Sequence, residues 1–254
     1  MALYLGSKKV AVTNTIEKKV PSMKAFFEAG GKCKGSTATS FDGCWQFGDT
    51  ANVTDMKSMF SSCSNLTTVP LFDTSNVTDM KSMFSICSKL TTVPQFDTSK
   101  VKNMSSMFDG CSKLTTVPQF DTSNVTIMDS MFYNCSNLTT VSRFDTSKVA
   151  DMGSMFYGCS KLTTVPQFDT SNVYYMNSIF SNCNNLEAIH MININANLNI
   201  SSSTKFTREA LIEIIGNLKA RTSGTKTLTM GSTNLAKLTE EDKAIATNKG
   251  WTLA

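Results

Sequence analysis

Residues 73–94 read DTSNVTDMKSMFSICSKLTTVP, and this frame recurs at a spacing of 24 residues between Asp49 and Ile189. The repeat is clearest in its cysteines, each of which follows a Met-Phe pair, or Ile-Phe in the last copy. Six copies in one frame are typical of a solenoid, in which a coil cannot bury its apolar face alone and stacks on its neighbours. The predicted structural core contains Phe60, Phe84, Phe108, Phe132, Phe156, Phe180, Cys63, Cys87, Cys111, Cys135, Cys159 and Cys183.

Each unit contains two patterns with different periods. Met56, Met59, Phe60 and Cys63 have the i, i+3, i+4, i+7 spacing of one face of a short helix. The following Leu-Thr-Thr-Val is rich in β-branched residues and mostly ends at proline, which predicts a short strand and a turn. The Asp-Thr-Ser that comes next supplies side chains that cap a turn. The sequence therefore predicts an α/β solenoid with one short strand and one short helix in each coil.

The order Val-x-x-Met-x-x-Met-Phe-x-x-Cys-x-x-Leu-x-x-Val resembles the BspA-type leucine-rich repeats of bacterial surface proteins and of many phage and prophage proteins. The likeness covers residues 49–189 and recurs in frame in every copy. It implies a right-handed coil with parallel strands on one face and helical segments on the other. It implies no single function, because one fold serves many functions.

The two ends break the period and are expected to cap the array, since a terminal apolar face must be shielded from water. Residues 1–48 are predicted to be an N-terminal cap or attachment segment that opens with a strand in LYLGSKKVAV. Residues 190–254 are predicted to form a helix-strand capping repeat. There we expect a strand in AIHMININANLNIS, a helix capped by Thr207, a strand in TKTLTMG, and a short helix that begins at Thr239 and ends at Gly250.

Composition argues against most enzyme chemistries. The 254 residues include one histidine, His190, and only 17% are charged, so a His-dependent triad or acid/base pair has a single candidate. The chain shows no nucleophile-base pair and no phosphate loop, although a glycosidase would need only two carboxylates. The net charge of +4 includes no block of like charge, and no run approaches the roughly 18 apolar residues of a membrane span. We expect no catalysis, no cofactor, no nucleic acid and no membrane insertion.

The cysteine column has three interpretations: a disulfide ladder, a metal ladder or a row of buried thiols. No histidine accompanies the column, and the paired spacing of a zinc site is absent, which favours buried thiols and no metal. The aspartate that opens each unit lacks the glycine-rich acidic pattern of calcium sites, so turn capping is favoured. Cys33 and Cys44 lie outside the period; they form a disulfide or remain free thiols, and we favour free thiols.

Two sets of exposed positions are candidate ligand-binding surfaces. Threonines stacked at about 4.8 Å per strand would form a hydroxyl-rich face able to bind sugars or the edge of a protein. Equally, threonine is an ordinary exposed strand residue. Tyrosines gather in the later copies, where exposed rings suit recognition unless they pack on each other. The candidates are Thr68, Thr92, Thr116, Thr140, Thr164, Tyr133, Tyr157, Tyr174 and Tyr175.

The N-terminal sequence lacks the pattern of a signal peptide, so we expect no export by that route. Both ends also resemble small phage and prophage proteins of gut bacteria, in YLGSKKV, AFFEAGGK and TLTMGSTNLAKLTEEDKAIATNKGWTLA. This likeness implies a bacteriophage virion protein of the fibre, tail or decoration type, which contacts other virion proteins and adheres to a host-surface glycan or protein. The alternative is a protein-protein interaction scaffold in the bacterial cytoplasm or at the cell surface. Either protein could form a homo-oligomer.

Overall fold

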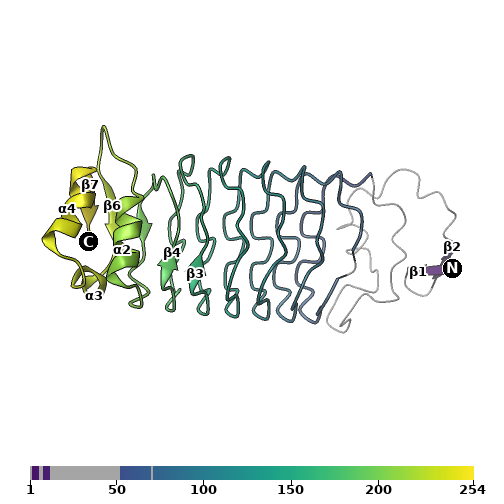
Figure 1. Ribbon diagram of the computed structural model, residues 1–254. Coiled ribbons are helices and arrows are strands. Elements are labelled where there is room, and N and C mark those ends of the chain that lie inside the picture. The colour runs from purple at the N-terminus through teal and green to yellow at the C-terminus, as the bar shows by residue number, and fades with distance from the viewer. Residues whose placement is uncertain (1, 6–7, 12–51, 70) are drawn as a thin grey trace.

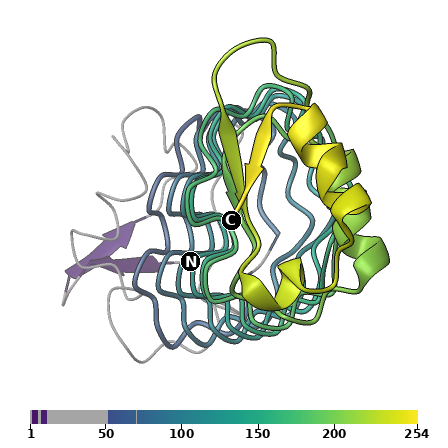
Figure 2. The same ribbon diagram turned by 90° about the vertical axis from the view of Figure 1, so that its left-hand side faces the viewer.

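The computed structural model describes residues 2–5, 8–11, 52–69 and 71–254. From residue 52 onward the chain forms an elongated stack of coils, and the end-on view shows the coils lying behind one another (Figures 1 and 2). Near the N-terminus, β1 (Ala2–Leu5) and β2 (Lys8–Ala11) pair antiparallel, so the single strand predicted there is wrong. The rest of the predicted N-terminal cap, with Cys33 and Cys44, lies outside the described residues.

Neighbouring coils are joined by a ladder of backbone hydrogen bonds. The N–H groups of alternate residues donate to carbonyls in the next coil at 2.6 to 3.1 Å, as Met56 does to Asp79 and Phe60 to Met83. Parallel bridges repeat in the same register, from Asp55 with Asp79 to Asp151 with Tyr175. All these ladder N–H groups point toward the C-terminal end of the stack.

This ladder replaces the short helix that the repeat pattern predicts, and that prediction is wrong. A helix needs its N–H groups for bonds four residues back, whereas here the alternate N–H groups bond to the next coil. Within a coil, four-residue β-turns remain, such as the one closed by the Met59 N–H and the Met56 carbonyl at 3.2 Å. Ser58 (φ +55°) and Ser62 (φ +65°) have left-handed backbone, which breaks a right-handed helix. The apolar spacing still identifies the buried face, since Met56, Met59 and Phe60 are buried.

The predicted strand in each coil is also mostly absent. In the described coils it appears only near the C-terminal end, where β3 (Thr164–Val165) pairs parallel with β4 (Ala188–Ile189). Earlier coils are joined at this position by isolated bonds, such as Thr91 N–H to the Thr67 carbonyl at 3.1 Å. The turn-capping role predicted for the aspartates is confirmed: Asp73 Oδ1 accepts from the Ser75 N–H at 2.9 Å, and later units repeat this bond.

Phenylalanine columns fill the interior of the stack. Successive rings from Phe60 to Phe180 lie 5.4 to 5.9 Å apart, nearly parallel. The cysteines from Cys87 to Cys183 are fully buried, and each thiol donates to a Phe carbonyl of the preceding coil, as Cys87 does to Phe60 at 3.1 Å. Cys63, predicted in the same core, is only half-buried. Each buried large side chain contributes roughly 1.5–3 kcal/mol before conformational entropy is counted.

The C-terminal part ends the stack with a small sheet and helices. β5 (Leu198–Asn199), β6 (Lys226–Thr229) and β7 (Trp251–Leu253) form a parallel sheet in that order. The predicted strand in TKTLTMG is confirmed by β6, whereas the long strand predicted over AIHMININANLNIS is reduced to β4, β5 and isolated bridges.

Helices α2 (Arg208–Gly216) and α4 (Glu240–Asn248) begin at the predicted caps Thr207 and Thr239. Gly250 follows α4 at φ +77°, as its position predicts. The short helix α3 (Ser232–Leu235) and β7 have no counterpart in the sequence analysis. His190 is half-buried, and its Nδ1 lies 2.7 Å from Glu213 Oε1 in α2, which connects the last coil to this helix. Among the described residues, no helix is long and apolar enough to cross a membrane.

Candidate binding surfaces

In five of the coils, the threonine column presents one hydroxyl with no hydrogen bond to another described residue. Thr92, Thr116 and Thr140 are exposed, and Thr68 and Thr164 are half-buried. None of these five hydroxyls hydrogen-bonds to another residue that the structure describes. In contrast, the preceding threonine of a pair can be occupied: the Thr91 hydroxyl donates to the Thr67 carbonyl at 3.1 Å. The second threonines therefore keep their hydroxyls available, whereas Thr91 and Thr139 use theirs within the stack.

The candidate tyrosines form two separate pairs. Tyr133 and Tyr157 are half-buried and stack on each other, with ring centroids 4.6 Å apart and planes 7° apart. They occupy the position that holds Ser61 in the first described coil. Tyr174 and Tyr175 are neighbours in the last coil and are 69% and 60% exposed. They are among the most exposed large apolar side chains of the described residues.

The residue at the bridge position of each coil, such as Asp55 in the first described coil, determines whether the backbone N–H two residues later has a side-chain acceptor. Where this position is Asp or Asn, the side chain accepts the N–H two residues later, as Asp151 Oδ1 does from Gly153 at 2.8 Å. Ile127 and Tyr175 hold the same position in their coils and have no such acceptor. The Asn177 N–H consequently has no hydrogen-bond partner among the described residues. The capped coils are those of Asp55, Asp79, Asn103 and Asp151.

The ladder stops at the last coil. The N–H groups of Met176, Ser178 and Phe180 correspond to donors in every earlier described coil, yet they reach no acceptor among the described residues. Asn182, next in this series, donates to the Ser202 hydroxyl at 3.2 Å. β5 lies beyond this segment and pairs with β6 rather than with the coil.

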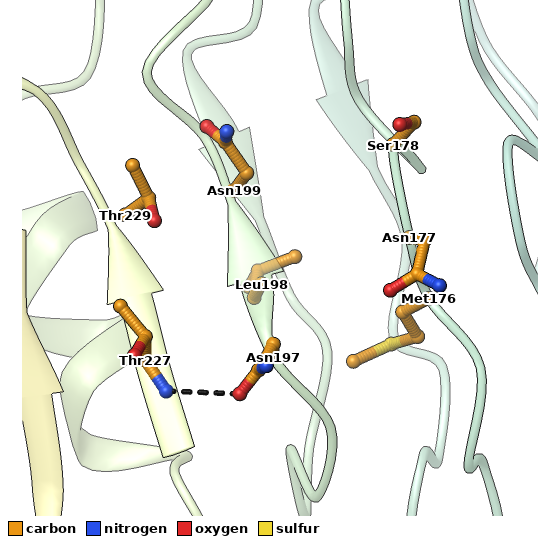
Figure 3. Close-up of a pocket in the computed structure, with 8 residues that line it drawn as sticks. All are labelled: Met176, Asn177, Ser178, Asn197, Leu198, Asn199, Thr227 and Thr229. Carbon is orange, nitrogen blue, oxygen red and sulfur yellow. Dashed lines mark hydrogen bonds between the residues drawn. The ribbon is translucent and has the colours of Figure 1, made fainter.

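A pocket of about 280 Å³ lies at this break, and we call it the ladder-end pocket. Figure 3 shows residues of the last coil on one side, residues around β5 in the middle and residues of β6 beyond them. The pocket is lined by Met176, Asn177, Ser178, Asn197, Leu198, Asn199, Thr227 and Thr229, none of which is charged. Sequence reasoning missed this pocket; its signals were Tyr175 in place of Asp or Asn and the end of the period after Cys183.

The side chains of the ladder-end pocket keep several donors unused. Asn197 Oδ1 accepts from the Thr227 N–H at 3.0 Å, and Asn199 Oδ1 accepts from the Ser201 hydroxyl at 2.7 Å. The Nδ2 groups of both asparagines have no partner among the described residues. The pocket therefore offers amide and hydroxyl groups without a charged side chain.

The thiols of the cysteine column lie in a desolvated environment, as expected for a protein core. Desolvation raises the pKa of Cys111 and of Cys183 to about 12, so these thiols stay protonated near neutral pH. Among the residues that the structure describes, no group of three or more His, Cys, Asp or Glu side chains is placed to hold a metal ion.

Comparison with protein families gives a match to "Mycoplasma protein of unknown function, DUF285" over residues 21–139 and 113–210, together more than half of the chain. Similar solved structures include the leucine-rich repeat protein TpLRR of T. pallidum, with 16% identity, a TM-score of 0.49, and coverage of 74% of this chain and 84% of that one. A leucine-rich cell surface protein of Faecalibacterium prausnitzii A2-165 has 19% identity and a TM-score of 0.38; the similarity covers 68% of this chain and 51% of that protein. No curated protein matches the chain.

Proposed function

This chain belongs to the family described as "Mycoplasma protein of unknown function, DUF285", and we propose that it is a non-catalytic scaffold that binds a partner through side chains on the surface of its stacked coils. The family description assigns no activity, so the proposal depends on this chain's own surface. Its elongated stack presents equivalent positions at a regular spacing, which suits an extended or repetitive partner.

The contrast between inward and outward positions carries the proposal. Inward positions keep the same residue types from coil to coil, as the Phe and Cys columns show. Outward positions of the same ladder change, and one of them is Asp55, Ile127 or Tyr175 in different coils. Stability of the stack does not require exposed rings such as Tyr174, whereas binding surfaces are enriched in tyrosine.

We extend the proposal to adhesion: the partner is a host-surface glycan or protein, and the protein is a component of a bacteriophage virion. The resemblance of both end segments to phage and prophage proteins supports the virion role, and the free threonine hydroxyls support glycan recognition. The alternative is a scaffold of the bacterial cell surface or cytoplasm, which would bind a protein through the same surface.

A glycan array and immobilised bacterial envelope proteins test the binding function. One variant, Tyr133→Ser with Tyr157→Ser, restores the serine found at this position in other coils. A second, Thr92→Lys with Thr116→Lys, blocks the threonine face. We expect at least one of the two to weaken binding about tenfold while circular dichroism stays unchanged, since removing an interface anchor costs 1–2 kcal/mol or more. The proposal would be contradicted if the protein bound neither the glycan array nor the envelope proteins. It would also be contradicted if both variants bound as well as the unchanged protein.

The virion role has a separate test in the genome. If the protein is a virion component, capsid or tail genes should flank its gene, and particles of that phage should contain the chain by mass spectrometry. A gene without phage neighbours would favour the alternative scaffold.

A further inference from the structure

We propose that the ladder-end pocket binds the carboxylate of an acidic sugar residue, such as a uronic or sialic acid. The inference deepens the proposed function, because it names the ligand class and one site for glycan recognition. It rests on the break in the hydrogen-bond ladder, the uncapped backbone beside Tyr175 and the unused polar groups around the pocket.

Three consecutive backbone N–H groups at the pocket have no acceptor among the described residues. Met176 and Ser178 belong to the interrupted ladder, and Asn177 loses its cap because Tyr175 replaces Asp or Asn. Ser178 has φ +57°, and left-handed residues help to turn successive N–H groups toward one anion. Unpaired backbone donors are costly unless water or a ligand accepts from them.

The earlier coils reinforce these donors. In each coil the series of alternate N–H groups that begins at Met56 in the first described coil points toward the C-terminal end, so these peptide dipoles are aligned along the stack and end at the last coil. An N–H beside the series, such as that of Thr78, points back to the preceding coil. A row of aligned dipoles that ends in free N–H groups attracts negative charge, as the N-terminus of a helix does. A carboxylate is the sugar substituent that supplies this charge.

The remaining pocket groups match the rest of a sugar. The Nδ2 groups of Asn197 and Asn199 and the hydroxyls of Thr227 and Thr229 make no hydrogen bond with other described residues and can bind sugar hydroxyls. A volume of about 280 Å³ is near the lower limit of small-molecule sites, about 300 Å³, which favours one sugar residue. Tyr174 and Tyr175 immediately precede the pocket lining, and their exposed rings offer apolar faces beside a polar site.

A peptide C-terminus also carries a carboxylate for the backbone donors, but each of its residues offers only one N–H and one C=O to the asparagine and threonine groups, fewer polar groups than the several hydroxyls of one sugar residue. An acidic sugar uses both sets, so we favour the sugar. The two ligands differ in experiment, because a short peptide with a free C-terminus lacks the ring of hydroxyl groups.

The test is a titration of the ¹⁵N-labelled full chain, followed through backbone amide shifts. The probes are N-acetylneuraminic acid and glucuronic acid, compared with neutral N-acetylglucosamine, with acetate and with triglycine. We expect both acidic sugars to shift the amide signals of Met176, Asn177 and Ser178 saturably, with a Kd on the order of 1 mM, since a single sugar residue makes few contacts. The neutral sugar, acetate and triglycine should bind at least about tenfold more weakly.

Two variants and a matched control locate the site. Asn199→Asp keeps the Oδ1 acceptor for Ser201 and replaces the amide by a negative charge, and it should weaken binding of both acidic sugars more than tenfold. Tyr175→Asn should cap the Asn177 N–H as Asn103 caps Ser105 at 2.9 Å, with a similar loss. Ile127→Asn makes the same change two coils away and should leave binding unchanged.

Each other result overturns the inference. Equal binding of acetate or triglycine would show a carboxylate site without sugar recognition, and equal binding of N-acetylglucosamine would remove the role of charge. No shift with either acidic sugar, or equal loss in Tyr175→Asn and Ile127→Asn, would exclude the pocket as the site. The scaffold function is judged separately: it stands if the Tyr133→Ser/Tyr157→Ser or Thr92→Lys/Thr116→Lys variants lose array binding while Asn199→Asp keeps it.

Discussion

The thiol of Cys135 lies in the stack with no exposed surface and donates to the Phe108 carbonyl at 3.1 Å. Desolvation raises the pKa of this thiol well above its ordinary value, and neighbouring coils repeat the arrangement. A cysteine here fills the space of a small apolar residue and also gives a second hydrogen bond to a carbonyl that already accepts from the Cys111 N–H, which alanine cannot do. This double role gives a physical reason for cysteine at this position without a disulfide or a metal.

The rate at which each cysteine is alkylated should decrease with its burial. A raised pKa lowers the thiolate fraction at any given pH, and thiolate is the species that iodoacetamide attacks. Among the six cysteines of the column, near pH 8 we therefore expect half-buried Cys63 to be alkylated first, and Cys111, Cys135 and Cys159 at least about 100-fold more slowly, at the rate at which the coils open. Peptide mapping by mass spectrometry gives each rate. Equal rates for Cys63 and Cys135 in the native protein would contradict the buried column, and denaturant should make the rates converge.

At the scale of the coil, left-handed residues shape the ladder segment. The position of Ser62 holds Ile86 (φ +62°), Gly110 (φ +71°) and Asn134 (φ +55°) in the next coils. Glycine and asparagine tolerate this backbone, whereas a β-branched residue is strained in it. The side chain of Ile86 is 53% exposed, so it gains little burial in return.

Ile86→Gly should therefore stabilise the protein by about 1 kcal/mol, because the relief of left-handed strain exceeds the entropy cost of glycine. The ladder bond from residue 86 to the Asp109 carbonyl uses only backbone and remains. Urea unfolding followed by circular dichroism measures the change. Gly110→Ala is the matched control: its Cβ would lie 3.5 Å from the Ile86 Cα, an ordinary contact, so strain alone should destabilise it by about 1 kcal/mol. Destabilisation by Ile86→Gly would contradict this account.

The same positions explain what the sequence could and could not predict. The spacing of Met56, Met59 and Phe60 identifies a buried face, but helix and ladder segment satisfy it equally. Glycine at 110 and 158 and asparagine at 134 and 182, all at one position of the repeat, were the available sign of left-handed backbone. The C-terminal helices were predictable because Thr207 and Thr239 are local caps. The ladder-end pocket was not, since it depends on how the last coil meets β5.

At the scale of the whole molecule, the stack is built by translation. Each described coil bonds to the next in one register. If one whole unit were deleted, the coil before it would therefore meet an equivalent coil as its new neighbour. Phe84, for example, would stack on Phe132 instead of Phe108. Such arrays gain most of their stability from contacts between adjacent units.

Deletion of residues 100–123 joins Ser99 to Asn124 and removes one complete coil. We expect the variant to fold cooperatively and to be shorter by about 4.8 Å, the spacing of neighbouring strands, as measured by small-angle scattering with circular dichroism as the check on folding. Deletion of residues 100–111 removes half a coil and mismatches the register at the junction, so the coils on its two sides cannot bond to each other and the stack should not fold as one cooperative unit. Similar behaviour of the two deletions would contradict translational stacking.

The direction of the ladder also determines how the molecule responds to force. Bonds between coils run along the length of the stack, so tension between the two ends loads the interfaces in series, and the weakest opens first. A repeat of 24 residues, the separation that links Thr78 to Thr54, releases about 80 Å of extended chain when its coil opens. A tether of this kind lengthens in equal steps under load, and each step dissipates energy before the attachment at either end carries the full force.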